Sequence, residues 1–173
     1  VLEGRGLGNE LAFFIFEYER DEEIVIRRHI EKLLAKVEQL NSSVRIASIN
    51  LSELIFTRLQ EEGLIERAED MEANLVTSKM LENLRHVCTS QDIAKSIISK
   101  HPPDSADIYM VHGVGSAFPI LRAHGVLSAL HSRIDGKPLI LFFPGKFTGT
   151  RLVLFDQIQD DHYYRAFRLF GEK

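Results

Sequence analysis

Two glycines, a serine and two basic side chains lie close together in the sequence, in a pattern that could bind an anion. The turn at residues 112–116 follows an apolar run, residues 106–111, that predicts a strand, and it precedes a predicted helix at residues 119–134. Backbone N–H groups at the start of a helix favour a phosphate, and glycines let it approach closely. The candidate phosphate or anion site consists of Gly113, Gly115, Ser116, Arg122 and His124.

This glycine pattern differs from the established nucleotide-binding motifs. The dinucleotide fingerprint has a third glycine where this chain has Phe118, and the Gly-Lys-Ser/Thr of a Walker A motif is absent. Short motifs of this kind often occur without a ligand, so a tight turn with a purely structural role is the first interpretation. A degenerate nucleotide- or phosphate-binding domain remains the alternative function.

Metal and nucleophilic chemistry receive little support from the spacing of side chains. The histidines do not form His-x-x-x-His or His-Glu-x-x-His, and no carboxylate stands at ligand spacing beside His112, His124 or His131. Cys88 is the only cysteine, which excludes a site built from several cysteines. The Gly-x-Ser-x-Gly motif of many hydrolases is missing. We therefore expect no metal and no cofactor, and the balance favours a protein that is not an enzyme.

The C-terminal residues 160–170 combine aromatic side chains with arginines, the types that dominate interaction hot spots. The structural alternative is an edge strand or a final helix whose aromatic side chains close the core. As a protein interface, the segment would use Tyr163, Tyr164, Arg165 and Phe167.

Charge and composition exclude several classes of partner. The 173 residues carry a net charge of -4, so no overall positive field attracts DNA, RNA or an anionic membrane. A local basic face on the first predicted helix is interleaved with Glu31 and Glu38, which favours a solvated surface; its members are Arg27, Arg28, Lys32 and Lys36. The longest apolar runs are too short to cross a bilayer. We expect a cytoplasmic protein that contacts neither membrane nor nucleic acid directly.

The periodicity of apolar residues predicts alternating strands and helices. Predicted strands cover residues 11–18, 44–51, 106–111 and 139–143, with an edge or hairpin strand at 151–155. Predicted helices run from Asp21 to Leu40, from a cap at Ser52 through Gln60, twice between residues 64 and 100, and over 119–134. The second helix between residues 64 and 100 has Thr89 or Ser90 as its predicted cap. Strands separated by helices favour a single three-layer α/β domain over residues 1–173, with a mainly parallel sheet of about four core strands.

Several blocks of the sequence, taken together, are more specific than any single glycine motif. In chain order they are Gly8-Asn9-Glu10 with residues 13–18, Gly113-Val114-Gly115, Phe118-Pro119, Arg122-Ala123-His124, residues 141–145 with Gly149, and residues 161–167. These blocks resemble the BrxB family of bacteriophage-exclusion (BREX) defence systems. The resemblance extends over essentially the whole chain, although residues 64–103 carry little of it.

The resemblance implies a small cytoplasmic protein that works beside a DNA methyltransferase, a large ATPase and the alkaline-phosphatase-like protein PglZ. It supplies no catalytic residues, and it implies an assembly factor with PglZ as the direct partner and other BREX proteins nearby. Family members begin with a helical segment before the Gly-Asn-Glu block. This chain carries almost none of that segment, so we expect it to be missing here.

Overall fold

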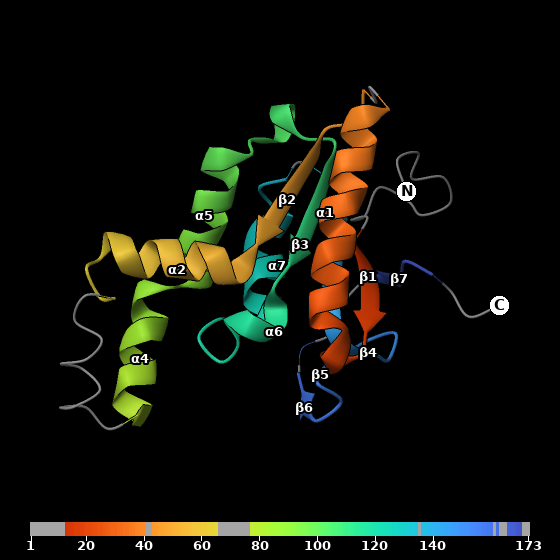
Figure 1. The fold of residues 1–173 in the computed structure, drawn as a ribbon. Helices are drawn as coiled ribbons and strands as arrows, with labels where there is room; N and C mark the ends of the chain where they lie inside the picture. Colours follow the sequence, from red (N-terminus) through yellow and green to blue (C-terminus); the bar gives the residue numbers. More distant parts are fainter. Residues whose placement is uncertain are drawn as a thin grey trace.

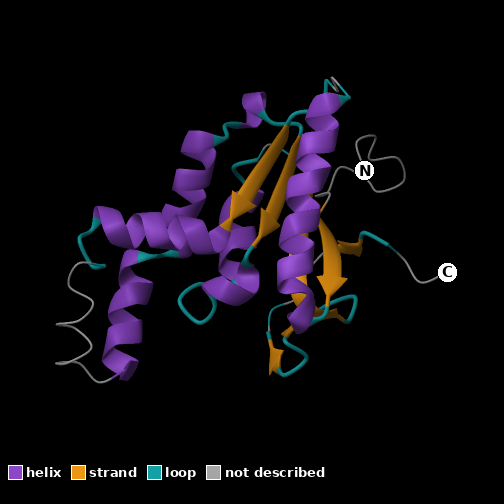
Figure 2. Ribbon diagram, viewed as in Figure 1, coloured by secondary structure: helices purple, strands orange, loops and turns teal. Residues whose placement is uncertain are grey.

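In the part of the chain that the structure describes, seven strands and their connecting helices make up the fold (Figures 1 and 2). The computed structural model describes residues 13–40, 43–65, 77–134, 136–160, 162 and 166–170. The strands are β1 (Phe13–Tyr18), β2 (Ile46–Asn50), β3 (Ile108–His112), β4 (Leu139–Phe147), β5 (Leu152–Leu154), β6 (Ile158–Gln159) and β7 (Phe167–Arg168).

Helices connect most of these strands. The α-helices are α1 (Glu23–Gln39), α2 (Leu51–Glu61), α4 (Thr77–Val87), α5 (Ser90–Lys100), α6 (Val114–Ala117) and α7 (Ala123–His131). Short 3-10 turns, Arg20–Glu22 and Pro103–Ser105, precede α1 and β3. Within the described residues, no helix combines the length and the apolar character that crossing a bilayer requires.

The main path of the sheet has the order β2-β3-β4-β1-β7, and each neighbouring pair along it is parallel. β5 and β6 extend the far end of β4 as antiparallel neighbours. In Figure 1, α1 crosses in front of the strands, while α6 and α7 lie behind them. This arrangement confirms the predicted α/β fold with a mainly parallel sheet flanked by helices.

The two faces of the sheet bury different sets of side chains because successive residues of a strand point to opposite sides. On the core face, Ile15, Leu141 and Phe143 join buried residues of α2, α5, α6 and α7. On the α1 face, Phe142 packs with Ile30 of α1 in a smaller cluster. We refer to these two surfaces as the core face and the α1 face.

Helix α1 is lightly attached to its face. Among its 17 residues only Ile30 is buried, while Ile24 and Val25 are exposed, as is Leu40 directly after the helix. The Tyr18 hydroxyl donates a hydrogen bond to the Glu23 carboxylate at the start of the helix. Burial and this contact with Glu23 raise the pKa of Tyr18 well above its ordinary value.

Two of the sequence predictions about helix starts need correction. The helix predicted from Pro119 begins only at Ala123 as α7, and a separate short helix, α6, forms at Val114–Ala117, where a turn was predicted. Phe118, between the two helices, is extended. The cap of α2 is Asn50, whose side chain accepts from the Ser52 N–H at 3.2 Å, and not Ser52. Of the two caps predicted for α5, Thr89 and Ser90, the structure shows Thr89, whose side chain accepts from the Asp92 N–H at 3.2 Å.

The strand predicted at residues 139–143 is longer in the structure, where β4 covers Leu139–Phe147. Pro144 and Gly145 do not end it, because β4 runs on to Phe147 and pairs there with β5. Gly145 has φ 144°, and a Cβ at this position would lie 2.1 Å from the Val153 carbonyl oxygen. The absence of a side chain therefore allows the two backbones to approach each other at this point.

Candidate functional site

The first two residues of the predicted anion site lie where β3 passes into α6. Gly113 has φ 73°, in the left-handed region that favours glycine, and it forms the N-cap of α6. A Cβ at Gly113 would lie 2.2 Å from Asn50 Oδ1, so the turn packs directly on the side chain that caps α2. Ser116 is exposed in α6, a helix of only four residues.

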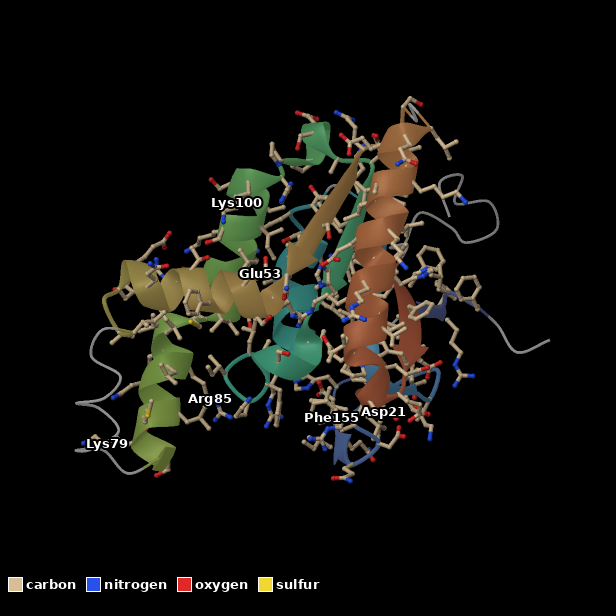
Figure 3. All side chains as sticks on the ribbon, in the orientation of Figure 1. Asp21, Glu53, Lys79, Arg85, Lys100 and Phe155 are labelled. Atoms are coloured by element: carbon tan, nitrogen blue, oxygen red, sulfur yellow. The ribbon has the colours of Figure 1, made fainter. Side chains whose placement is uncertain are left out.

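Gly115 faces aromatic and proline side chains. A Cβ at Gly115 would lie 3.0 Å from the Phe155 ring and 3.2 Å from Pro144. The guanidinium of Arg20 lies 5.1 Å from the centroid of the same Phe155 ring, and Figure 3 shows Phe155 near Asp21 at this end of the molecule. Packing thus gives a reason for both glycines, in keeping with the structural interpretation of the turn. Anion binding here stays a prediction.

The other two predicted residues open α7. Arg122 is the exposed N-cap of this helix, and His124 lies in its first turn. Arg122 and Val114 line a cavity of about 30 Å³, whose walls are mostly apolar. A space of that size accommodates about one water molecule and is far smaller than a typical nucleotide pocket.

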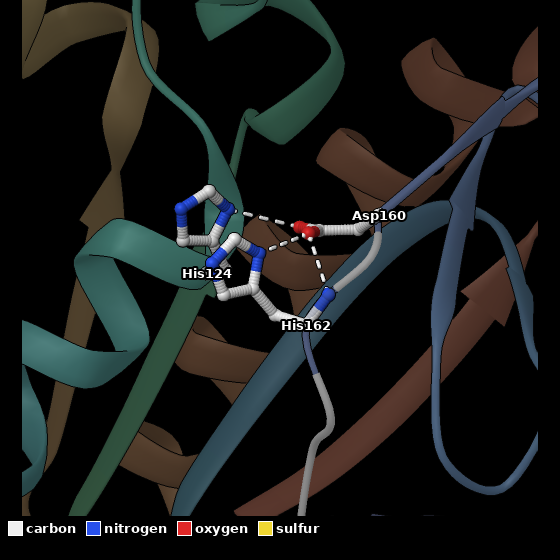
Figure 4. A group of neighbouring side chains, drawn as sticks. All are labelled: His124, Asp160 and His162. Atoms are coloured by element: carbon white, nitrogen blue, oxygen red, sulfur yellow. Dashed lines mark hydrogen bonds and ion pairs between the residues drawn. The ribbon is translucent and has the colours of Figure 1, made fainter.

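The structure brings His124 together with two residues from the far end of the chain. His124 Nδ1 lies 2.9 Å from Asp160 Oδ2, and His162 Nδ1 lies 2.7 Å from Asp160 Oδ1 (Figure 4). The two imidazole rings stack with centroids 4.0 Å apart and planes 14° apart. We call His124, Asp160 and His162 the His-Asp-His cluster. Sequence spacing missed it because His124 and Asp160 are separated by 36 residues and lie in different elements.

A polar cleft lies at the carboxyl ends of β2 and β3, between α1 and α5. Ser48 Oγ and His112 Nε2 are 3.2 Å apart, and burial lowers the pKa of His112. Asn50 Nδ2 donates to Glu53 Oε1 at 2.7 Å. Glu53 lies in the first turn of α2, beside the end of β2 in Figure 3. Two adjoining pockets, of about 200 and 170 Å³, share Ser48, Asn50 and Glu53.

This cleft could bind a small polar molecule, since hydroxyl, amide, imidazole and carboxylate groups converge there. The signal that could have found it is the rule that ligands sit beyond the carboxyl ends of parallel strands. That rule applies directly to Asn50 and His112, which pair across β2 and β3.

Of the four predicted interface residues, the structure describes one. Phe167 starts β7, which pairs with β1 at the edge of the sheet, so the C-terminal segment forms an edge strand. Phe167 is 37% exposed and Phe170 is 74% exposed. Tyr163, Tyr164 and Arg165 lie outside the described residues.

Comparison with known proteins agrees with the resemblance in the sequence. The profile of a family described as BREX protein BrxB matches residues 47–169. A BREX protein BrxB from Bacillus cereus (strain H3081.97) is 37% identical over 174 residues, covering 98% of this chain and 89% of that protein. The chain belongs to the BrxB family. A BREX protein BrxB from Escherichia coli O9:H4 (strain HS) is 33% identical over 168 residues, covering 97% and 82% of the two chains. No solved structure matches this chain.

Family membership makes this chain a component of a BREX defence system, alongside the other proteins of that system. The matched range contains the anion-site residues, the His-Asp-His cluster, Phe167 and the β2, β3, α2 and α5 residues of the polar cleft, whereas the α1 residues of that cleft lie outside it. Strand β1 lies outside the matched range, but the pairwise similarity to the Bacillus cereus protein covers 98% of the chain and includes this strand.

Proposed function

We propose that this chain is a non-enzymatic assembly or adaptor subunit of a BREX complex that works in the cytoplasm and binds the alkaline-phosphatase-like protein PglZ. Membership of the BrxB family supports the setting. One structural observation supports a docking role, namely a group of partly exposed phenylalanines at the β7 edge of the sheet. This aromatic patch consists of Phe14, Phe16, Phe167 and Phe170.

The rings of the aromatic patch contact one another. Phe14 and Phe167 are 6.3 Å apart between ring centroids, and Phe16 and Phe170 meet edge to face at 5.9 Å. Exposed aromatic clusters of this kind are typical of interface hot spots, because each ring buries a large apolar area when a partner covers it. The patch therefore offers PglZ a ready apolar contact.

Two polar contacts hold the patch in place. Arg168 Nε lies 3.0 Å from Glu17 Oε2 of β1, and Arg168 Nη2 donates to the Phe147 carbonyl at 2.6 Å. These contacts hold β7 against the sheet before a partner arrives, which lowers the entropy lost on binding. Tyr163, Tyr164 and Arg165 directly precede the patch in sequence and belong to the same proposed interface.

The test is co-purification with the PglZ protein of the same operon, followed by size-exclusion chromatography with mass detection. We expect a stoichiometric complex, and we expect the double variant Phe167→Ala/Phe170→Ala to weaken it by at least about tenfold, the loss typical of hot-spot residues. Phe56→Ala is the matched control, because Phe56 is 56% exposed but lies on α2.

Separate elution of the two folded proteins would contradict the choice of PglZ. Equal binding by the double variant and by Phe56→Ala would contradict the choice of surface. Alanine substitutions at Tyr163, Tyr164 and Arg165, measured in the same assay, then show whether the interface extends into that segment.

A further inference from the structure

Three side chains from distant parts of the sequence lie close together beside α7. His124 comes from the first turn of α7, whereas Asp160 and His162 follow β6 near the end of the chain. The possible ligand atoms of all three lie within 4.8 Å of one another. Two imidazoles and a carboxylate from distant segments form a donor set that several metalloproteins use.

We propose that His124, Asp160 and His162 bind one divalent transition-metal ion, of which zinc is the best match. Imidazole nitrogen and carboxylate oxygen suit zinc, cobalt and nickel, while a magnesium or calcium site would be built mainly from oxygen ligands. The ligands would be Nδ1 of each histidine and a carboxylate oxygen of Asp160. Three protein ligands leave a further position for water, as in open zinc sites.

The hydrogen bonds of the cluster define what must change when the ion binds. An ionised Asp160 only accepts, so in these contacts each histidine donates through Nδ1–H. On binding, a neutral imidazole moves its proton to Nε2 and gives the Nδ1 lone pair to the metal, and an imidazolium releases one proton.

One ring must also reorient. The two rings stack with planes 14° apart, and the Nδ1–H group of each is directed at Asp160, so the two Nδ1 atoms do not converge on a single ion in this arrangement. The His162 side chain is 62% exposed, so it has room to turn, whereas His124 is 24% exposed and stays in the first turn of α7. The polypeptide thus supplies one fixed histidine, one adjustable histidine and a carboxylate between them.

Because of where the site lies, a bound ion would link two segments of the chain and stabilise the folded state. It would join α7, whose Val126 and Leu130 are buried in the core, to the segment that leads into β7. A ligand that binds only the folded state stabilises it by mass action. Zinc should therefore raise the temperature of unfolding, and a chelator should reverse the rise.

The test is isothermal titration calorimetry of the whole chain with Zn²⁺, together with visible absorption after addition of Co²⁺. We expect one ion per chain and a Co²⁺ spectrum typical of nitrogen and oxygen ligands. His124→Gln, Asp160→Asn and His162→Gln should each weaken Zn²⁺ binding by at least about tenfold and abolish the thermal shift. His29→Gln is the control, because His29 is an exposed histidine of α1 away from the cluster.

Failure to fold does not obscure the result, because His162 is exposed and its substitution leaves the core intact. Absence of Zn²⁺ binding by the folded chain would overturn the proposal, and the cluster would then be a hydrogen-bonded contact only. The proposal would also be overturned if Zn²⁺ bound equally strongly to the variants His162→Gln, Asp160→Asn and His29→Gln. All of these measurements use the chain without PglZ, so their outcome is independent of the proposed docking function.

Discussion

The core face and the α1 face of the same sheet are buried to different degrees. On the core face, Phe143 and Leu141 lie under four helices and are almost inaccessible to solvent. On the α1 face, one helix with a single buried residue, Ile30, covers part of the sheet, and Phe14 and Phe16 remain partly exposed.

This difference assigns different roles to the two faces: the core face stabilises the fold, and the α1 face is available to contact a partner. Free energy of folding scales with the apolar area removed from water, so the core face supplies most of it. The α1 face retains apolar area that a partner protein can still bury, and it holds both the aromatic patch and part of the polar cleft. The following substitutions test this division, beginning with the one expected to have the largest effect.

Removal of an aromatic ring from the core face should be the most damaging change. Phe143→Ala deletes a side chain that is 2% exposed and leaves a cavity among packed neighbours. We expect a loss of about 3–5 kcal/mol in the free energy of unfolding, measured with urea. A loss below about 1 kcal/mol would show that this face does not dominate stability.

A methyl group at Gly113 should disturb the turn between β3 and α6, at the carboxyl end of the sheet. Gly113→Ala places a Cβ against the Asn50 cap of α2 and requires a left-handed backbone from alanine. We expect a loss of about 2–3 kcal/mol from backbone strain and loss of the cap. Gly136→Ala is the matched control, because Gly136 has φ 68° but no atom within 4 Å of a new Cβ. Equal losses in the two variants would show that strain alone matters.

Truncation on the α1 face should cost less than on the core face. Ile30→Ala removes the one buried side chain of α1, and the thin layer above it can relax into the space. We expect a loss of about 2 kcal/mol, at the low end for such changes, by the same urea titration. A loss equal to that of Phe143→Ala would contradict the contrast between the faces.

The polar cleft should make stability depend on pH. Burial lowers the pKa of His112 from its ordinary value of 6.5, so below that pH the unfolded chain binds a proton that the folded chain resists. The stabilising contribution of neutral His112 is therefore complete above pH 6.5 and declines as the pH falls towards the lower folded value. Urea unfolding at a series of pH values should show a shallower decline for His112→Gln than for His29→Gln.

The aromatic patch should be nearly neutral for stability. Phe170→Ala removes a ring that is 74% exposed, and we expect the free energy of unfolding to change by no more than about 0.5 kcal/mol. A loss of binding to PglZ with unchanged stability would sharpen the distinction between the two faces. Destabilisation comparable to Ile30→Ala would instead make the patch part of the core.

Local sequence patterns predicted most elements because their signals lie within a few residues. The apolar and aromatic run around Ile15 and the helical spacing around Ile30 identify β1 and α1. Thr89 identifies the start of α5, since a cap acts on its own first turn. Phe118-Pro119 misled the prediction because proline is compatible both with a first helical turn and with an extended link between two helices.

For the candidate sites, the sequence alone determined which residue types are present: the glycines of the β3–α6 turn, the aromatic residues near the C-terminus and the family. Only the tertiary structure decided what surrounds them. It places Phe155 against Gly115, Asn50 against Gly113, and Asp160 between His124 and His162. Such contacts join positions tens of residues apart, and they form because the strand order and the packing of helices bring those segments together, which no local period of the sequence encodes.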